Sequence, residues 1–146
     1  MAKVMITDSD KKVLKGYFKN RKDIAFAFLF GSQARGNATA LSDVDIAVYF
    51  YPNNRWYIEY EQEVFYDAED EIWADIERIL KKEVELLVLN RVSVCVGASA
   101  IKGIPLAIND WRLYLDFMVI ITHAAEDFRE FIISDYIERA GIERRG

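Results

Sequence analysis

The stretch Leu29-Phe-Gly-Ser-Gln-Ala-Arg-Gly-Asn-Ala-Thr-Ala-Leu-Ser-Asp-Val-Asp-Ile-Ala-Val-Tyr-Phe50 decides the fold of this chain. It begins with the end of an apolar run that starts at Ile24, and it breaks at Gly31-Ser32. Ten residues later it enters a second apolar run that carries Asp43 and Asp45. Apolar runs rich in β-branched and aromatic residues, bounded by Gly and Ser, are typical of buried strands. The stretch therefore predicts a strand, a tight turn and a second strand.

Asp43 and Asp45 are expected to point the same way, because side chains alternate across a strand with a period of two. Two carboxylates about 7 Å apart on one face repel each other unless a cation lies between them. Mg²⁺ takes oxygen ligands of this kind, usually one or two carboxylates together with substrate phosphates. Acids also occur on exposed edge strands for other reasons, so this inference depends on the neighbouring Gly31-Ser32.

Gly31-Ser32 falls where the first strand ends and a short helix begins. Free backbone N–H groups, a glycine without a Cβ atom and a hydroxyl donor suit a phosphate group at such a place. One segment therefore offers both a phosphate-binding turn and a pair of metal ligands.

Gly31-Ser32, followed after ten residues by Asp43-Val-Asp45 and enclosing Ala34-Arg35-Gly36, resembles the signature of the DNA-polymerase-β-like nucleotidyltransferase superfamily. Within it, the chain is most similar to the minimal nucleotidyltransferases (MNT), small proteins often paired with HEPN-domain ribonuclease toxins. The resemblance is specific over residues 26–49 and looser, in the same order, to about residue 109. It implies transfer of a nucleoside monophosphate from a nucleoside triphosphate to a hydroxyl group, with two metal ions.

Glu83 to Leu89 predicts a third strand, on which Glu85 shares a face with Leu87 and Leu89. A lone acid among apolar residues is costly to bury unless it is paired or binds a metal. The resemblance implies a third carboxylate on this strand, and Glu85 falls at its place although the family usually has Asp there. An exposed acid on an edge strand is the alternative.

The resemblance implies two Mg²⁺ ions as cofactor and ATP as the donor. Asp43 and Asp45 would hold the ion that grips the triphosphate. Glu85 would help to hold the second ion and accept the proton of the attacking hydroxyl.

The phosphate side of the site is expected at Gly31 and Ser32, which would position the β- and γ-phosphates, with Arg35 neutralising charge nearby. The MNT resemblance implies an antitoxin that transfers AMP to a tyrosine of a HEPN toxin and also binds this toxin. Two alternatives stay open: transfer to the hydroxyl of a small molecule such as an aminoglycoside, and a catalytically weak module that neutralises its partner by contact.

Composition sets bounds on these hypotheses. The 146 residues, 52% hydrophobic and 29% charged, fit one globular domain. One cysteine, one histidine and no visible signal peptide argue against disulfides and multi-histidine zinc sites, and favour a cytoplasmic protein. The net charge of −5 argues against nucleic acid as the main partner. Charge is segregated, with a net of +5 over residues 1–22 and −7 over residues 53–80.

The remaining patterns predict an α/β fold, a small mixed sheet with helices packed mainly on one side. Helices are expected over 8–19, 32–37, 55–82, 92–102 and 110–140, and a short edge strand over 104–108. The nucleotidyltransferase core would span about residues 8–109 of a single domain, and the last helix would follow it.

The last helix is unusually apolar, since ten of the thirteen residues from Leu113 to Ala125 are apolar. This run is too short and too interrupted to span a membrane. A helix that is apolar around most of its circumference must be buried on several sides. Part of that burial is expected to come from another chain, a HEPN partner or a second copy in a homo-oligomer, and complete burial within the monomer is the alternative.

Overall fold

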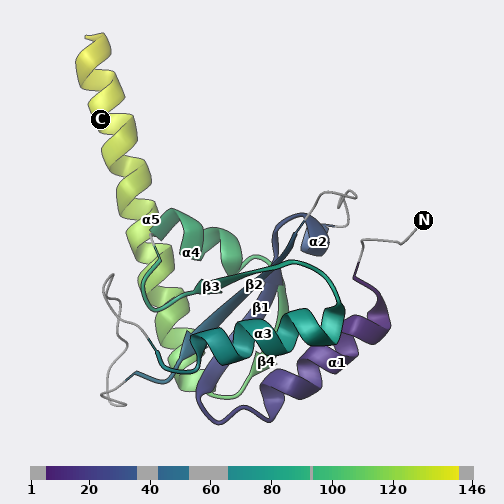
Figure 1. Ribbon diagram of the computed structural model, residues 1–146. Coiled ribbons are helices and arrows are strands. Elements are labelled where there is room, and N and C mark those ends of the chain that lie inside the picture. Colours follow the sequence, from purple (N-terminus) through teal and green to yellow (C-terminus); the bar gives the residue numbers. More distant parts are fainter. Residues whose placement is uncertain (1–5, 36–42, 53–65, 93, 142–146) are drawn as a thin grey trace.

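The computed structural model describes residues 6–35, 43–52, 66–92 and 94–141 (Figure 1). Within them the elements, in chain order, are α1 (Asp8–Lys19), β1 (Ile24–Phe30), α2 (Gly31–Arg35), β2 (Val44–Phe50), α3 (Glu69–Leu80), β3 (Val84–Val88), α4 (Val94–Ala100), β4 (Ile104–Ile108) and α5 (Trp111–Ala140). The bounds of β1, β4 and α5 match the predicted ones. The helix predicted over 55–82 is described only from Glu69, because residues 53–65 lie outside the described part.

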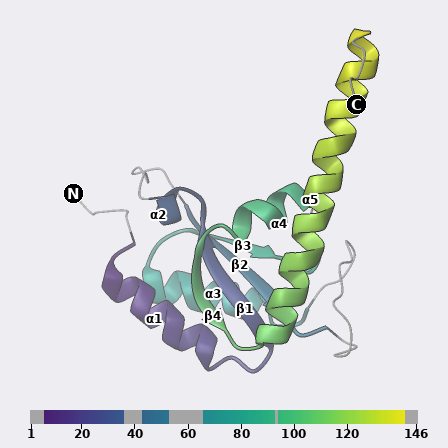
Figure 2. The same ribbon diagram turned by 180° about the vertical axis from the view of Figure 1, so that it is seen from behind.

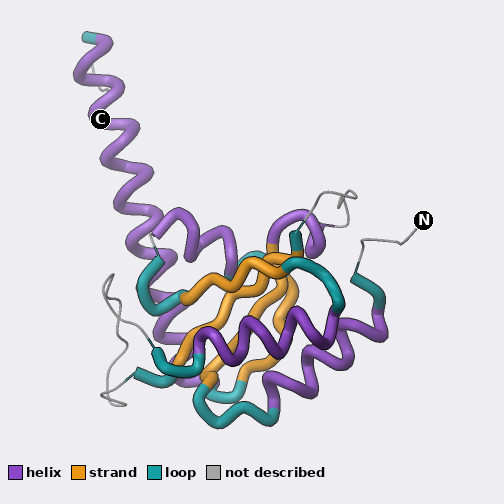
Figure 3. Tube along the Cα trace, in the orientation of Figure 1, coloured by secondary structure: helices purple, strands orange, loops and turns teal. Residues whose placement is uncertain are grey.

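The four strands form one mixed sheet in the order β3-β2-β1-β4 (Figure 3). β1 is antiparallel to both β2 and β4, whereas β2 and β3 are parallel. β4 therefore lies at one edge, as predicted, and β3 lies at the other. The C-terminal end of β1 and the N-terminal ends of the other three strands meet at one end of the sheet.

Both faces of the sheet are covered by helices, rather than mainly one face as expected (Figures 1 and 2). On one face, α1 and α3 bury Leu14, Phe18, Ile72 and Ile76 against alternate residues of all four strands. On the other, α5 buries Leu113, Phe117 and Ile121 against Phe26, Phe28 and Tyr49, together with part of α4. β1 and β2 are apolar on both sides because they are the central strands of this three-layer arrangement.

The start of α1 is fixed by a capping box. The Thr7 hydroxyl accepts a hydrogen bond from the backbone N–H of Asp10, and the Asp10 carboxylate accepts one from the N–H of Thr7. This reciprocal pair satisfies two backbone donors that the helix itself cannot pair. Thr7 is therefore the N-cap of α1.

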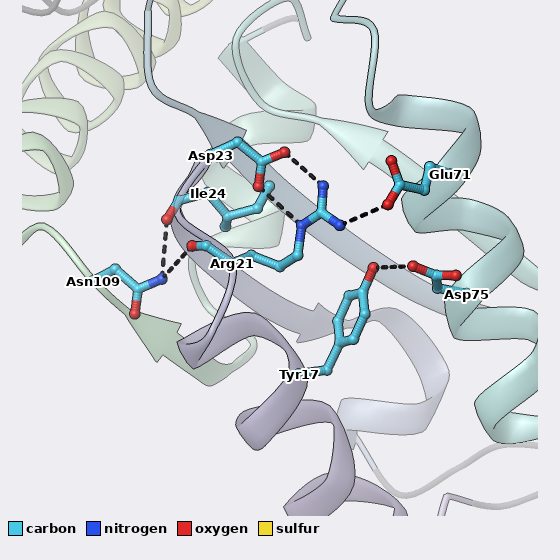
Figure 4. A network of polar contacts seen from close by, with 7 residues as sticks. All are labelled: Tyr17, Arg21, Asp23, Ile24, Glu71, Asp75 and Asn109. Carbon is cyan, nitrogen blue, oxygen red and sulfur yellow. Dashed lines mark hydrogen bonds and ion pairs between the residues drawn. The ribbon is translucent and has the colours of Figure 1, made fainter.

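A polar network joins α1 to α3 (Figure 4). The guanidinium of Arg21 forms ion pairs with Asp23 at 2.6 Å and with Glu71 at 3.1 Å. The Tyr17 hydroxyl donates a 2.7 Å hydrogen bond to Asp75. Burial and this hydrogen bond raise the pKa of Tyr17, and the same bond lowers the pKa of Asp75. Part of the charge segregation seen in the sequence is therefore neutralised inside the chain, where basic α1 lies beside acidic α3.

Two asparagines, Asn90 and Asn109, form side-chain hydrogen bonds to backbone groups of neighbouring segments. The side chain of Asn90, fully buried, both donates to the carbonyl oxygen of Phe50 and accepts from its N–H, each at 2.9 Å. The amide of Asn109 donates to the carbonyl oxygen of Phe18 at 2.9 Å and to that of Ile24 at 3.0 Å, and Figure 4 shows the second of these bonds. These contacts replace backbone pairing where the chain leaves the strands.

α5 has 30 residues and is therefore about 45 Å long. Its N-terminal part packs on the sheet, and its C-terminal part projects away from the body (Figures 1 and 2). The Asp110 side chain caps its first turn, and Gly141 ends it in a left-handed conformation. None of the described helices combines the length and the hydrophobicity that a membrane span requires.

Candidate functional site

Two neighbouring strands, β2 and β3, bring candidate acids to one end of the sheet. Asp45 is in register with Glu85 on the parallel neighbour β3 and with Phe30 on the antiparallel neighbour β1. In-register residues of adjacent strands point to the same face and lie about 5 Å apart. Asp45 is partly buried and Glu85 is exposed. The structure therefore brings Asp45 and Glu85 together, although 39 residues of the chain lie between them.

Asp43 stands directly before β2, and its side chain is exposed. It lies two residues from Asp45, so an extended backbone would turn both carboxylates to the face that also carries Ala47 and Tyr49. Asp45 and Glu85 therefore lie at one corner of the sheet, where β2 and β3 begin, and Asp43 directly precedes β2.

Gly31 makes the turn from β1 into α2, and it has a backbone conformation that other residues rarely adopt. Its φ angle is +73°, in the left-handed region. A Cβ atom added to Gly31 would overlap Oδ2 of Asp45. Only glycine therefore allows the Asp45 carboxylate to lie directly against the start of α2.

Gly31→Ala is expected to lower the free energy of unfolding by about 1–2 kcal/mol, because alanine is strained at positive φ and would displace the Asp45 carboxylate. Gly16→Ala is the matched control, since Gly16 lies inside α1 with open space around its Cβ position. That change should instead stabilise the protein by about 0.5–1 kcal/mol. Urea unfolding monitored by circular dichroism measures both. Equal stability of Gly31→Ala and the wild type would contradict the close contact with Asp45.

Gln33 holds α2 in place, and the sequence patterns gave no signal for it. Its side chain is buried, and its Oε1 atom accepts a 2.9 Å hydrogen bond from the N–H of Ile6. The partner is 27 residues away, so no local motif could reveal it. The side chains of Ser32 and Arg35 lie outside the described part, and their expected roles remain predictions.

A cavity of about 240 Å³ adjoins Gly31 on the β4 side of the site. Phe30, Gly31 and Ala34 line one wall, and the other wall comes from the end of α4 and the start of β4, including Lys102. Three larger hollows lie elsewhere: two, of about 340 and 550 Å³, border Tyr51 beyond the far end of β2, and one, of about 410 Å³, lies between α1 and β4. The seven residues of β2 put about 20 Å between that end and the acids. The cavity beside Gly31 therefore lies at the same end of the sheet as Asp45 and Glu85.

The donor set fits a hard divalent cation. Asp43, Asp45 and Glu85 supply carboxylate oxygens, and Asp45 lies against a turn that a side chain would fill. Mg²⁺ prefers such oxygen ligands and keeps the rest of its shell for water and phosphate. Within the described residues, no three His, Cys, Asp or Glu side chains are grouped closely enough to hold a metal ion by themselves. An open pair of acids agrees with a site that a phosphate ligand completes.

Known protein structures share this architecture. A chain of a toxin–antitoxin complex with AMP-PNP superposes with a TM-score of 0.62 at 22% identity, over 88% of this chain and 98% of that one. A chain of a tri-AMPylated Shewanella oneidensis HEPN toxin in complex with an MNT antitoxin gives 0.57 at 18% identity, over 87% and 98%. A chain of the mutant D39ED41E of the toxin–antitoxin MntA-HpeT gives 0.63 at 21%, over 88% and 98%. At these identities the likeness establishes the fold.

No curated protein matches the sequence at a significant level. The family model described as "Polymerase beta, Nucleotidyltransferase" matches residues 12–112, which is more than half of the chain. That range contains the Gly31 turn, Asp43, Asp45 and Glu85, and it ends as α5 begins. On the strength of this match and of the shared fold, the chain belongs to the polymerase β nucleotidyltransferase family.

Proposed function

We propose that this protein is an Mg²⁺-dependent nucleotidyltransferase that transfers AMP from ATP to a hydroxyl of a protein partner, a tyrosine of a HEPN-type toxin. One observation carries the proposal: Asp45 is in register with Glu85 and in contact with the glycine turn that starts α2. Two carboxylates in register on adjacent strands repel each other, and a divalent cation bound between them would relieve that repulsion.

In the proposed reaction, the acceptor oxygen forms a bond to the α-phosphorus of ATP. The bond from that phosphorus to the oxygen bridging the α- and β-phosphates breaks, and pyrophosphate leaves. Glu85 accepts the proton of the attacking hydroxyl, for which its exposed position is suited. Asp43 and Asp45 would hold Mg²⁺, which when bound neutralises charge on the phosphate oxygens. Catalysis then rests mainly on positioning and electrostatic stabilisation.

The choice of AMP and of a HEPN partner is supported by the structural relatives. Chains with this fold occur in a toxin–antitoxin complex with AMP-PNP and in a complex with a tri-AMPylated HEPN toxin. The exposed apolar residues of α5 supply a surface on which a protein acceptor could dock. A small-molecule acceptor would not need such a surface.

The test is to incubate the chain with ³²P-α-labelled ATP, Mg²⁺ and a HEPN-domain protein from the same genome. Label is expected on a tyrosine of the HEPN protein, located by mass spectrometry, and EDTA should prevent it. Label on an added aminoglycoside but not on the HEPN protein would overturn the choice of acceptor. Absence of label with every acceptor would overturn the proposed activity.

Glu85 offers a graded test of the third carboxylate. Glu85→Gln is expected to lower kcat about 100-fold or more, because an amide can neither accept the proton nor neutralise a cation. Glu85→Asp should keep most of the rate, since Asp is the residue usual in the family at this position. Steady-state transfer assays measure both. A Glu85→Gln variant with the wild-type kcat would place the base and third ligand elsewhere.

A further inference from the structure

The turn between α4 and β4 is pressed against the end of β1, immediately before the Gly31 turn. A Cβ atom added to Gly103 would overlap the carbonyl oxygen of Leu29 and would lie 2.9 Å from Cβ of Phe30. Gly103 therefore permits a backbone approach that any side chain would prevent. This close packing fixes the position of its neighbour, Lys102, beside the site.

Lys102 and Gly31 line the same cavity of about 240 Å³. The side chain of Lys102 is exposed, and its ammonium group forms no hydrogen bond or ion pair with the part of the chain that the structure describes. Within the described residues, the ammonium group therefore makes no polar contact that would stabilise the fold. Its position next to Gly31 is explained if the cavity receives an anion.

The charges of the site are ordered across the end of the sheet. Glu85 on β3 and Asp45 on β2 form the acidic side, Gly31 follows at the end of β1, and Lys102 stands next to β4. A nucleoside triphosphate held by its α-phosphate near the acids would extend its β- and γ-phosphates past Gly31. Those terminal phosphates carry most of the negative charge and require a cation other than the metal.

We propose that Lys102 binds the β- and γ-phosphates of the donor nucleotide in this cavity and so selects a triphosphate over a monophosphate. Lysine suits the role, because its ammonium is a compact charge on a flexible stem that reaches phosphate oxygens from an exposed turn. The inference rests on the proposed function, since it assumes that a nucleotide binds at Gly31 and the acids.

The experiment compares the affinities of the full-length chain for ATP, ADP and AMP by isothermal titration calorimetry with Mg²⁺. Lys102→Ala is expected to raise the Kd for ATP about tenfold and to leave the Kd for AMP within about twofold, because only ATP and ADP reach Lys102. Lys102→Arg should recover most of the loss. Lys22→Ala is the matched control, as Lys22 is exposed at the opposite end of β1.

Three outcomes would overturn the inference. An unchanged Kd for ATP in Lys102→Ala would show that the charge does not contact the phosphates, while wild-type AMP transfer would leave the proposed function standing. An equal loss for ATP and AMP, with a lower melting temperature, would assign Lys102 a structural role. A wild-type chain that binds no ATP would remove the inference together with the proposed function.

Discussion

Asp45→Asn is expected to abolish AMP transfer, with a loss of at least 1,000-fold, and to leave the fold intact. Asp45 lies between the other two described parts of the site, in register with Glu85 on one side and against Gly31 on the other. An amide of nearly the same shape would fill the same space but would not neutralise a divalent cation. Asp43→Asn is expected to act in the same direction, because both carboxylates are assigned to the same ion.

Metal-dependent stability provides a second measure that does not require the acceptor. The wild-type melting temperature should rise by about 5–10 °C at a Mg²⁺ concentration 100-fold above Kd, since this binding contributes about 2.7 kcal/mol. Asp45→Asn should lose most of this shift. Without metal the variant should keep the wild-type fold, because asparagine has nearly the same shape as aspartate.

Glu126→Gln is the control for these measurements, because Glu126 is exposed on α5 and distant in sequence from the site. It should keep both the transfer rate and the Mg²⁺ shift. If transfer survives in both Asp43→Asn and Asp45→Asn, the proposed mechanism is wrong for this protein, whatever its fold.

Much of the fold could be predicted because its signals are local. The apolar run Ile24–Phe30, bounded by charged residues and glycine, specified β1, and the capping residues Thr7 and Asp110 fixed where α1 and α5 begin. The distribution of the helices over both faces of the sheet could not be predicted from local signals. It follows from α5 returning across Phe26 and Tyr49, and a helical pattern alone does not say which face of a sheet it will cover.

One part of the site could likewise be predicted from local sequence signals, and another part could not. The spacing of Gly31, Asp43 and Asp45 was visible in the sequence, because all three lie on one β1–α2–β2 unit. The register of Glu85 with Asp45 depends on a parallel pairing reached through α3, so the family resemblance had to supply it. Lys102 could not be found from sequence, because its place beside the site results from the packing of Gly103 on Leu29.

α5 carries two apolar rows with different surroundings. The row Leu113, Phe117 and Ile121 is buried on the sheet. On the other side of the helix, Trp111, Leu115 and Val119 are 61%, 52% and 57% exposed. Residues two positions apart on a helix point about 200° apart, which explains why the rows lie on opposite sides. The exposed row is the surface on which we expect the HEPN partner to bind.

The double variant Leu115→Lys with Val119→Lys is therefore expected to weaken binding of the HEPN partner by at least 100-fold. Each apolar side chain buried in an interface contributes about 1.5–3 kcal/mol, and lysine would also place an unpaired charge there. The variant should fold and bind ATP as the wild type does, because both positions are exposed on α5, whereas Gly31 lies at the end of β1. Calorimetric titration with the partner measures the loss.

Ser9→Lys with Val13→Lys on α1 is the control, since it adds the same charge at exposed positions of another helix. It should leave partner binding unchanged. Light scattering of the isolated wild type determines whether a second copy occupies the α5 row when the partner is absent; in that case the α5 variant should be monomeric and the α1 variant should not. A monomeric wild type whose α5 variant still binds the partner at full affinity would show that the exposed row of α5 contacts neither. Partner binding would then have to depend on another surface, and the proposed delivery of a HEPN tyrosine to Glu85 would lose its support from α5.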